Sequence, residues 1–269
     1  MKRAAVIGWP VSHSLSPRLH HYWLKQYGID GHYQAIAVEP AKLAEFLKTL
    51  PASGLVGVNL TIPHKEQALD LVDEIDDTAR HIGAVNTILM RDGKLFGTNT
   101  DAYGFIHNLR SAAVTKKKAL VIGAGGASRA VCAGLLKEGY AIALINRTRE
   151  KADHIAAVLG GKISVMPWER YGEAMKDIGL LVNTTSLGMK GQAPLTLSLD
   201  TLPTAAVVTD IVYTPLNTAL LAAAETRGNP VLDGLGMLLY QAQPAFEAFF
   251  GFKPEVTGAL KAHMVEALK

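Results

Sequence analysis

Short apolar runs alternate with segments of helical periodicity along the chain. In the first hundred residues this pattern predicts strands near 4–7, 33–38, 55–60 and 85–89, and helices near 17–27, 41–50 and 64–71. Asp92-Gly93 predicts a hairpin turn into a further strand at 94–97. Because strands that alternate with helices build largely parallel, helix-covered sheets, the pattern indicates an α/β protein.

The strands follow one another more closely after the basic run Lys116-Lys117-Lys118. They are predicted near 119–122, 141–145, 163–165, 180–183, 206–210 and 230–232. Six strands with intervening helices are what a doubly wound, Rossmann-type sheet requires. The remaining residues predict two helices, separated at 251–254, that return to the first domain. We therefore expect two domains: residues 1–101 together with 237–269, and residues 102–236.

Composition narrows the class of protein. Of 269 residues, 49% are hydrophobic and 19% are charged, which excludes an intrinsically disordered chain. The net charge of +3 is too small to indicate a nucleic-acid partner, and no apolar run approaches the roughly 18 residues of a membrane span. The apolar run that ends at Gly8 is too short for a signal peptide, and Cys132 is the only cysteine. We expect a cytoplasmic protein with a small-molecule partner and no metal, as a monomer or homodimer.

A glycine-rich turn follows the first strand of the second half. Leu120-Val121-Ile122 leads into Gly123-Ala124-Gly125-Gly126-Ala127, and a helical pattern follows. Gly123 permits a sharp turn, Gly125 leaves room for a diphosphate, and a helix N-terminus offers N–H groups to that anion. Residues 123–127 are therefore candidates for binding a dinucleotide. The alternative is a glycine-rich turn without a ligand.

The end of the next strand bears on the choice of dinucleotide. NAD-binding folds place an acidic residue there, whereas this chain has Asn146-Arg147-Thr148-Arg149. A guanidinium binds a phosphate, which a carboxylate would repel. We expect these four residues to accept the 2′-phosphate of NADP; a basic helix start on the surface is the alternative.

The first half has its own polar segments where strands meet helices. In Ser12-His13-Ser14-Leu15-Ser16-Pro17, Ser16 is the expected cap of a helix that Pro17 begins. The same hydroxyls also suit a bound carboxylate, so both interpretations fit. His20 and His21, two neighbouring histidines further along, are expected on the surface of that helix.

A second polar segment reads Asn59-Leu60-Thr61-Ile62-Pro63-His64-Lys65. Asn59 and Thr61 share one face of a strand because side chains alternate. Pro63 is predicted to start a helix with Lys65 in its first turn, where a cation opposes the helix dipole. A solvated surface lysine is the alternative.

Further polar clusters, Asn86-Thr87 and Thr98-Asn99-Thr100-Asp101, also end strands. Ligands of open α/β sheets bind outside the carboxyl ends of the strands, so these clusters and Lys65 are candidates for one site. An aspartate beside Lys65 would favour the charged ammonium. Alternatively, Asp101 caps a helix near 102–110.

Together these segments resemble the shikimate dehydrogenase family over nearly the whole chain. The resemblance rests on residues 14–17, 59–65, 83–87, 99–104, 123–127, 146–148, 183–189 (Asn-Thr-Thr-Ser-Leu-Gly-Met) and 233–238 (Asp-Gly-Leu-Gly-Met-Leu). It implies NADPH-dependent reduction of 3-dehydroshikimate to shikimate, in chorismate and aromatic amino acid biosynthesis. The first domain would bind the substrate and the second NADP.

The resemblance also implies residue roles. Lys65 would be the proton donor and acceptor, with Asp101 beside it. The substrate carboxylate would meet Ser14, Ser16 and Tyr213, and the hydroxyls would meet Asn59, Thr61, Asn86 and Gln241. Asp77, Ile211 and Gly234 would lie near the cofactor.

Two other functions fit parts of the pattern. One is a quinate/shikimate dehydrogenase that uses NAD, which Arg147 without a neighbouring acid disfavours. The other is an NADP-sensing protein without turnover, which the presence of both Lys65 and Asp101 disfavours.

Overall fold

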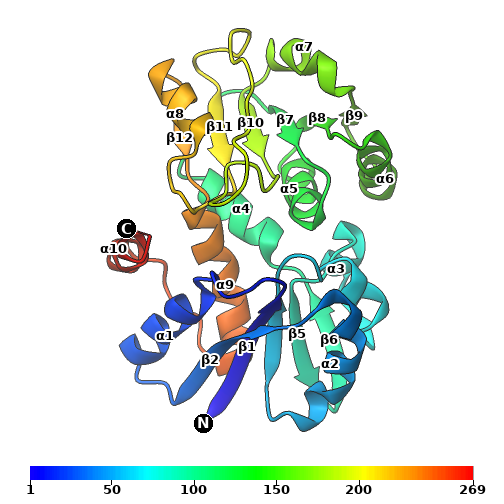
Figure 1. Cartoon of the computed structure of the whole chain (residues 1–269), viewed down its shortest axis with the longest axis vertical. Helices are drawn as coiled ribbons and strands as arrows, with labels where there is room; N and C mark the ends of the chain where they lie inside the picture. Colours follow the sequence, from blue (N-terminus) through cyan, green and yellow to red (C-terminus); the bar gives the residue numbers. More distant parts are fainter. Residues whose placement is uncertain (269) are drawn as a thin grey trace. The chain divides into compact units, whose positions relative to one another are not determined.

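The computed structural model describes residues 1–268, which divide into two compact units (Figure 1). The first comprises Met1–Gly104 with Leu238–Ala267, and the second comprises Phe105–Met237. The boundaries expected from the sequence, after 101 and after 236, lie slightly earlier. Each observed boundary falls inside a helix, α4 (Asp101–Leu109) or α9 (Leu235–Phe250). Helical periodicity runs through both points, so the sequence carries no local signal there.

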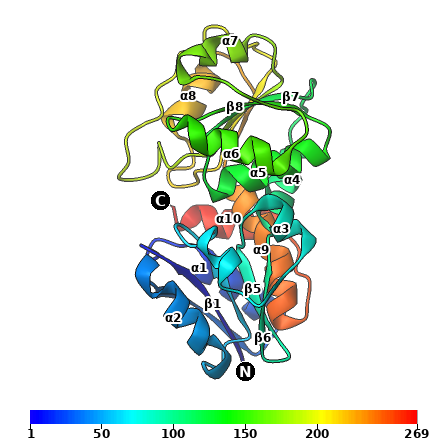
Figure 2. The same cartoon turned by 90° about the vertical axis from the view of Figure 1, so that its right-hand side faces the viewer.

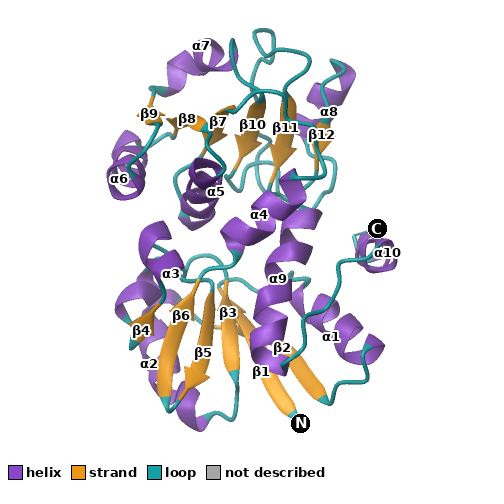
Figure 3. Cartoon of the chain, turned by 180° about the vertical axis from the view of Figure 1, so that it is seen from behind, coloured by secondary structure: helices purple, strands orange, loops and turns teal. Residues whose placement is uncertain are grey.

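The first unit is built on a sheet with strand order β2-β1-β3-β5-β6-β4 (Figure 3). Its strands are β1 (Lys2–Gly8), β2 (Gly31–Ala37), β3 (Gly57–Leu60), β4 (Glu74–Ile75), β5 (Thr87–Arg91) and β6 (Lys94–Thr98). Only β5 runs against its neighbours, β3 and β6. The predicted hairpin joins β5 to β6, and Asp92 (φ 51°) and Gly93 (φ 78°) adopt the left-handed conformations that such a tight turn requires.

Helices cover both faces of this sheet. The helices of this unit are α1 (Ser16–Gln26), α2 (Leu43–Thr49), α3 (Asp77–Ile82), α9 and α10 (Gly258–Glu266), with 3-10 turns η1 (Pro40–Lys42), η2 (Leu50–Ala52) and η3 (Gln67–Asp70). Alternation along β1 turns Ala5 and Ile7 toward a core that includes Leu43 of α2. On the other face, Phe249 of α9 lies directly over Gly57 of β3. The sheet is therefore buried between α2 and α9.

The second unit confirms the doubly wound prediction. Its parallel strands are β7 (Lys118–Ile122), β8 (Ala141–Ile145), β9 (Ile163–Val165), β10 (Leu180–Asn183), β11 (Val207–Asp210) and β12 (Val231–Leu232). Their order, β12-β11-β10-β7-β8-β9, reverses direction at β7, which is the arrangement of dinucleotide-binding folds.

The helices of the second unit are α5 (Gly126–Lys137), α6 (Arg149–Leu159), α7 (Tyr171–Met175) and α8 (Ala219–Thr226), with the 3-10 turn η4 (Trp168–Arg170). Figure 2 shows α5 and α6 side by side. From α7 and α8, Met175 and Leu221 enter a core with Leu120 and Ile122 of β7. The carboxyl ends of β7 and β8 thus lead into α5 and α6, where the predicted nucleotide-binding residues lie.

Two elements of the first unit, β4 and α3, have no counterpart in the prediction. The sequence nevertheless carries a signal for α3. Asp76 caps it by accepting a hydrogen bond from the Ala79 N–H at 2.7 Å, and Gly83 ends it with φ 71°. Within the described part of the chain, no helix is long and apolar enough to cross a membrane.

The close approach of α9 to β3 leads to a test of stability. A Cβ added to Gly57 would lie 2.4 Å from the Ile88 carbonyl oxygen and 2.5 Å from Phe249 Cε1. We expect Gly57→Ala to lower the free energy of unfolding by about 1–3 kcal/mol, the usual cost of overpacking. Urea denaturation followed by circular dichroism measures this. Gly258→Ala, where an added Cβ meets nothing within 4 Å, is the control. Equal unfolding midpoints for the two variants would contradict the packing described.

Candidate active site

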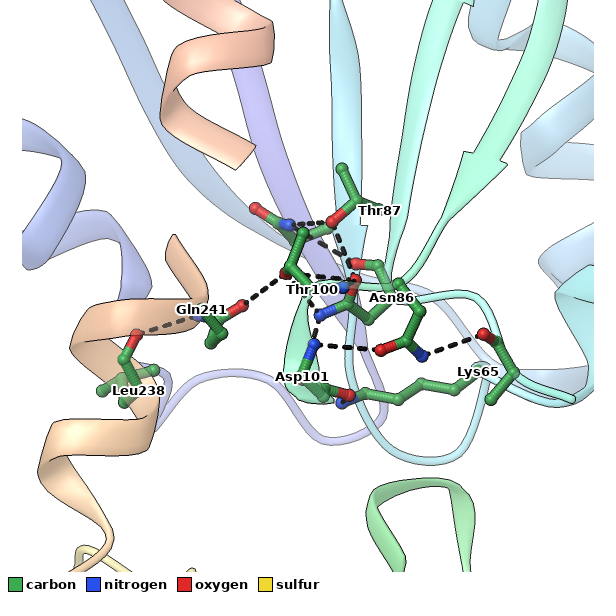
Figure 4. Close-up of polar contacts among 10 residues, drawn as sticks. Lys65, Asn86, Thr87, Thr100, Asp101, Leu238 and Gln241 are labelled. Atoms are coloured by element: carbon green, nitrogen blue, oxygen red, sulfur yellow. Dashed lines mark hydrogen bonds and ion pairs between the residues drawn. The ribbon is translucent and has the colours of Figure 1, made fainter. Parts of the chain in front are cut away.

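A buried ion pair forms the centre of the first unit's polar site (Figure 4). Lys65 Nζ lies 2.6 Å from Asp101 Oδ2, and the two side chains are only 16% and 5% exposed. Lys65 follows β3, and Asp101 is the first residue of α4, so separate junctions supply the two charges. Removing either partner from such a pair leaves an uncompensated buried charge, which is strongly destabilising.

The predicted helix at 64–71 is wrong. Residues 62–66 form turns, and only the 3-10 turn η3 follows. The Lys65 carbonyl accepts a hydrogen bond at 2.7 Å from the Val85 N–H, and the Leu69 N–H donates to Glu66 instead. Lys65 is therefore held against the segment that enters β5, and opposition to a helix dipole does not act on its ammonium group.

Asp101 is fixed by the polar residues around it. Its Oδ1 accepts a hydrogen bond from Asn86 Nδ2 at 2.9 Å, and its backbone N–H donates to Asn99 Oδ1 at 2.9 Å. Asn99 in turn donates to the Ala84 carbonyl at 2.9 Å. The helix begins at Asp101 rather than after it, and the carboxylate faces Lys65 and Asn86.

Asn86 connects most of the site. Its Nδ2 donates to Asp101 and to Thr100 Oγ1, and its Oδ1 accepts from the Thr100 N–H and from Thr87 Oγ1, each at 2.9 Å. Asn59 of β3 donates to Thr87 Oγ1 at 2.9 Å. Its Oδ1 accepts a 2.7 Å hydrogen bond from Tyr33. The polar residues predicted on β3 and before β5 thus form one continuous network.

Gln241 reaches this network from α9. Its Oε1 accepts a 3.5 Å hydrogen bond from Thr100 Oγ1, and its Nε2 donates to the Leu238 carbonyl at 3.0 Å. Thr61 is half-buried directly after β3, and its N–H donates to the Ile7 carbonyl at 2.9 Å. The structure therefore brings together Lys65, Asp101 and Gln241, although their positions in the sequence are far apart.

The serine segment departs from the prediction by one residue. Helix α1 begins at Ser16, its N-cap is Leu15, and Pro17 is the second helical residue, so Ser16 is not the cap. The reason is that Ser14 Oγ accepts the Ser16 N–H at 3.3 Å and draws Ser16 into the first turn. Ser16 is buried and Ser14 half-buried.

The glycine-rich turn fits a diphosphate. Gly123 has φ 110°, and a Cβ there would lie 2.7 Å from Thr184 Oγ1. A Cβ on Gly125 would meet nothing within 4 Å, and α5 starts at Gly126 without a side-chain cap. Ser128, in the place of a third glycine, is buried and donates to the Gly123 carbonyl at 2.6 Å. Thr184 and Ser128 thus fix the turn at Gly123, and the space beside Gly125, at the start of α5, is open to an anion.

The predicted phosphate-binding residues follow β8. Arg147, Thr148 and Arg149 are exposed, and Asn146 is half-buried and donates to the Thr148 carbonyl at 2.7 Å. Arg149 pairs with Asp153 on the same helix at 3.3 Å. Arg147 is the guanidinium nearest the end of β8, which suits a 2′-phosphate.

The remaining predicted residues lie in different places. In the second unit, Gly234 packs so closely on Ile211 that an added Cβ would be 2.3 Å from the Ile211 carbonyl oxygen, and Tyr213 is half-buried after β11. In the first unit, Asp77 is exposed in the first turn of α3. Their roles toward ligands stay predictions.

His20 is not on the helix surface as predicted. It is only 1% exposed and stacks on the Tyr33 ring, with centroids 3.8 Å apart and planes 10° from parallel. The sequence did carry a signal for the burial of His20, because Leu19, Trp23 and Leu24 place apolar side chains on the same face of α1 as His20. Burial, with a smaller contribution from the charge of His21, lowers the His20 pKa to about 3.

A doubly wound nucleotide fold, joined to an α/β unit with a buried lysine–aspartate pair, defines the class of dinucleotide-dependent oxidoreductases. Comparison with known proteins supplies the family. Residues 6–88 match the model of the shikimate dehydrogenase substrate binding domain, 107–190 that of shikimate/quinate 5-dehydrogenase, and 234–262 that of the shikimate 5′-dehydrogenase C-terminal domain. This chain belongs to the shikimate dehydrogenase family.

Individual proteins similar to this chain belong to the same family. The shikimate dehydrogenase (NADP⁺) of Paramagnetospirillum magneticum is 54% identical, over 97% of each chain. The crystal structure of shikimate 5-dehydrogenase from Thermus thermophilus in complex with NADP(H) and shikimate is 38% identical, with a TM-score of 0.88, over 100% of this chain and 98% of that one. Quinate dehydrogenase from Corynebacterium glutamicum in complex with NAD is 26% identical, with a TM-score of 0.89, over 99% and 98%.

The buried His20 predicts a pH dependence of stability. Its pKa is about 3 in the folded protein, against an ordinary value of 6.5, so between these values only the unfolded chain binds the proton. Stability is thus complete above about pH 6.5 and falls as the pH falls, by about 2 kcal/mol from pH 7 to pH 5. We expect His20→Phe, which keeps a ring beside Tyr33, to remove this part of the loss. Urea denaturation at both pH values measures it; an equal loss in both proteins would assign the acid sensitivity to other groups.

Proposed function

We propose that this protein catalyses the reversible, NADP-dependent reduction of 3-dehydroshikimate to shikimate, with Lys65 as proton donor and acceptor. This is a step of chorismate and aromatic amino acid biosynthesis. The observation that carries the proposal is the 2.6 Å pair of Lys65 and Asp101, buried within a chain of the shikimate dehydrogenase family. Relatives named for shikimate and NADP⁺ match this chain over nearly its full length.

Lys65 supplies the proton chemistry. When bound, the nicotinamide supplies or accepts the hydride. As the substrate carbonyl is reduced, its oxygen gains negative charge, which the Lys65 ammonium stabilises and then neutralises by donating a proton. In the oxidative direction, neutral Lys65 Nζ takes the proton of the C3 hydroxyl.

Asp101 keeps the lysine in place. Its Oδ2 accepts from Lys65 Nζ at 2.6 Å, while Asn86 Nδ2 donates to Oδ1 at 2.9 Å. The pair holds Lys65 Nζ at a fixed position, from which its ammonium group can stabilise charge on the reacting oxygen. Because Asn86 is itself held by Thr100, the carboxylate does not have to reorganise during the reaction.

The substrate-binding residues of the proposal combine hydroxyls and amides. A carboxylate bound by Ser14, Ser16 and Tyr213 would sit near the start of α1, whose N-terminal dipole favours an anion. Ring hydroxyls would meet amide and hydroxyl side chains of the network: Asn59, Thr61, Asn86 and Gln241. Support comes from the burial or half-burial of Asn59, Thr61, Asn86 and Gln241 and from the hydrogen bond that joins Asn86 to Asp101.

NADP would be held by the second unit. The turn of Gly123, Ala124, Gly125, Gly126 and Ala127 would bind the diphosphate, and Asn146, Arg147, Thr148 and Arg149 the 2′-phosphate. Asp77, Ile211 and Gly234 would lie near the cofactor, as the family resemblance implies. The cytoplasmic location and the monomeric or homodimeric state stay predictions from the sequence.

The most direct experiment follows absorbance at the NADPH wavelength with shikimate and NADP⁺. We expect shikimate-dependent formation of NADPH, and faster turnover with NADP⁺ than with NAD⁺ at equal concentration. An NADP-sensing protein would bind NADP⁺ without turnover. An enzyme like the NAD-bound quinate dehydrogenase would prefer quinate and NAD⁺.

Replacing the lysine tests its role. We expect Lys65→Ala to lower kcat by roughly 10²–10⁴-fold, the usual contribution of a general acid–base group, with a much smaller change in KM for shikimate. Steady-state kinetics in the oxidative direction measure both. Lys94→Ala is the matched control, because it removes a lysine from an exposed pair with Glu74 in the same unit. If Lys65→Ala stays within a few-fold of wild type, the lysine is not the catalyst.

Replacing the arginine tests the choice of cofactor. We expect Arg147→Ala to raise KM for NADP⁺ roughly 10- to 100-fold, since hydrogen bonds to charged groups are worth about 1.5–3 kcal/mol. KM for NAD⁺, which has no 2′-phosphate, should stay unchanged. Arg170→Ala, which removes an exposed guanidinium paired with Glu173 elsewhere in the unit, is the control. A parallel rise of KM for both cofactors would reject the phosphate role.

A further inference from the structure

We propose that Tyr33 is a positioning residue, whose hydroxyl orients the Asn59 amide so that its oxygen is presented to a substrate hydroxyl. The inference rests on the proposed function and adds a residue to it. Tyr33 lies on β2, within hydrogen-bond distance of Asn59 and not of the Lys65–Asp101 pair (2.7 Å to Asn59 Oδ1). It therefore acts through Asn59.

The direction of the hydrogen bonds begins at two groups that cannot change roles. The Thr100 backbone N–H only donates, and the Asp101 carboxylate, in its ion pair with Lys65, only accepts. Because the N–H lies 2.9 Å from Asn86 Oδ1 and the carboxylate lies 2.9 Å from Asn86 Nδ2, the Asn86 amide has a single favourable orientation.

The orientation of the Asn86 amide fixes the donor and acceptor roles of three further side chains: Thr87, Asn59 and Tyr33. Thr87 Oγ1 donates its only hydrogen to Asn86 Oδ1 at 2.9 Å, so it must accept from Asn59 Nδ2, also 2.9 Å away. The oxygen of Asn59 consequently faces Tyr33, whose hydroxyl donates at 2.7 Å. Tyr33 is thus the first donor in a chain of hydrogen bonds in which every donor points toward Asp101.

The surroundings keep Tyr33 a donor. Its side chain is fully buried, and burial raises the pKa of its hydroxyl well above the ordinary value. The His20 ring stacked on it is neutral near physiological pH, because burial lowers its pKa to about 3. No change of protonation on either ring reverses the chain under these conditions.

The hydrogen-bonding capacity that Asn59 has left determines which substrate group it can bind. Nδ2 is directed at Thr87 and, at 3.4 Å, at the Asn86 carbonyl, whereas Oδ1 has two lone pairs and Tyr33 uses one. The unused hydrogen-bonding capacity of Asn59 is therefore the second lone pair of Oδ1, which accepts. The residue as a whole is 7% exposed. A substrate hydroxyl that donates fits this site, and a keto oxygen at the same place does not.

The test removes only the hydroxyl. We expect Tyr33→Phe to raise KM and Kd for shikimate roughly tenfold, because a buried amide oxygen loses its partner and the amide its fixed orientation. KM for NADP⁺ should stay unchanged and kcat within about threefold, since the reacting oxygen is not involved. Tyr22→Phe, the same change on α1 of the same unit, should leave all constants unchanged. Unaltered shikimate constants in Tyr33→Phe would overturn the proposal.

A double-mutant cycle separates positioning from packing. In an Asn59→Ala background, Tyr33→Phe should have no further effect on KM for shikimate, whereas equal effects in both backgrounds would overturn the proposal. Thr87→Val breaks the chain on the other side of Asn59 and should give the same rise in KM; unchanged binding in both single variants rejects the chain. If the wild type binds no shikimate, the proposed function fails as well, whereas normal wild-type activity with a silent Tyr33→Phe rejects this inference alone.

Discussion

The ion pair between Lys65 and Asp101 sets the main constraint on the first unit. Two charges with 16% and 5% exposed side chains are stable only if their partners are held in place. β3 delivers the lysine, α4 begins with the aspartate, and Val85 anchors the Lys65 backbone through its N–H. Much of the polar structure around the pair can be understood as a means of fixing these two side chains.

The same constraint gives the site a defined pattern of donors and acceptors. A carboxylate at one end allows only one orientation of Asn86, and Asn86 determines the role of Thr87. A network of this kind is preorganised, so little reorientation is needed when charge develops on a bound oxygen. In the proposal above, the Asn59 end of this network offers an acceptor oxygen and so distinguishes a hydroxyl that donates from a group that only accepts.

In the second unit, the features that suit a nucleotide are formed by residues that lie close together in the sequence. Gly123 packs closely against Thr184, Gly125 leaves the space beside it open, Ser128 donates to the Gly123 carbonyl, and α5 follows directly. The segment after β8, Asn146-Arg147-Thr148-Arg149, contains no acidic residue, and the proposed function assigns the 2′-phosphate of NADP to it. The structural relatives include both NADP- and NAD-bound dehydrogenases of the same fold, so fold alone does not choose the cofactor.

The sequence by itself determined whatever depends on neighbouring residues: the six strands and glycine turn of the second unit, the hairpin at Asp92-Gly93, and the polar residues at strand ends. These follow from side-chain alternation, from φ angles that favour glycine, and from short turns. Tertiary structure decided the rest. Lys65 lies in a turn rather than a helix because of Val85, His20 is buried by packing against Tyr33, and Gln241 meets Thr100 across 141 positions. Such contacts are created by packing between distant segments, and no short stretch of sequence encodes them.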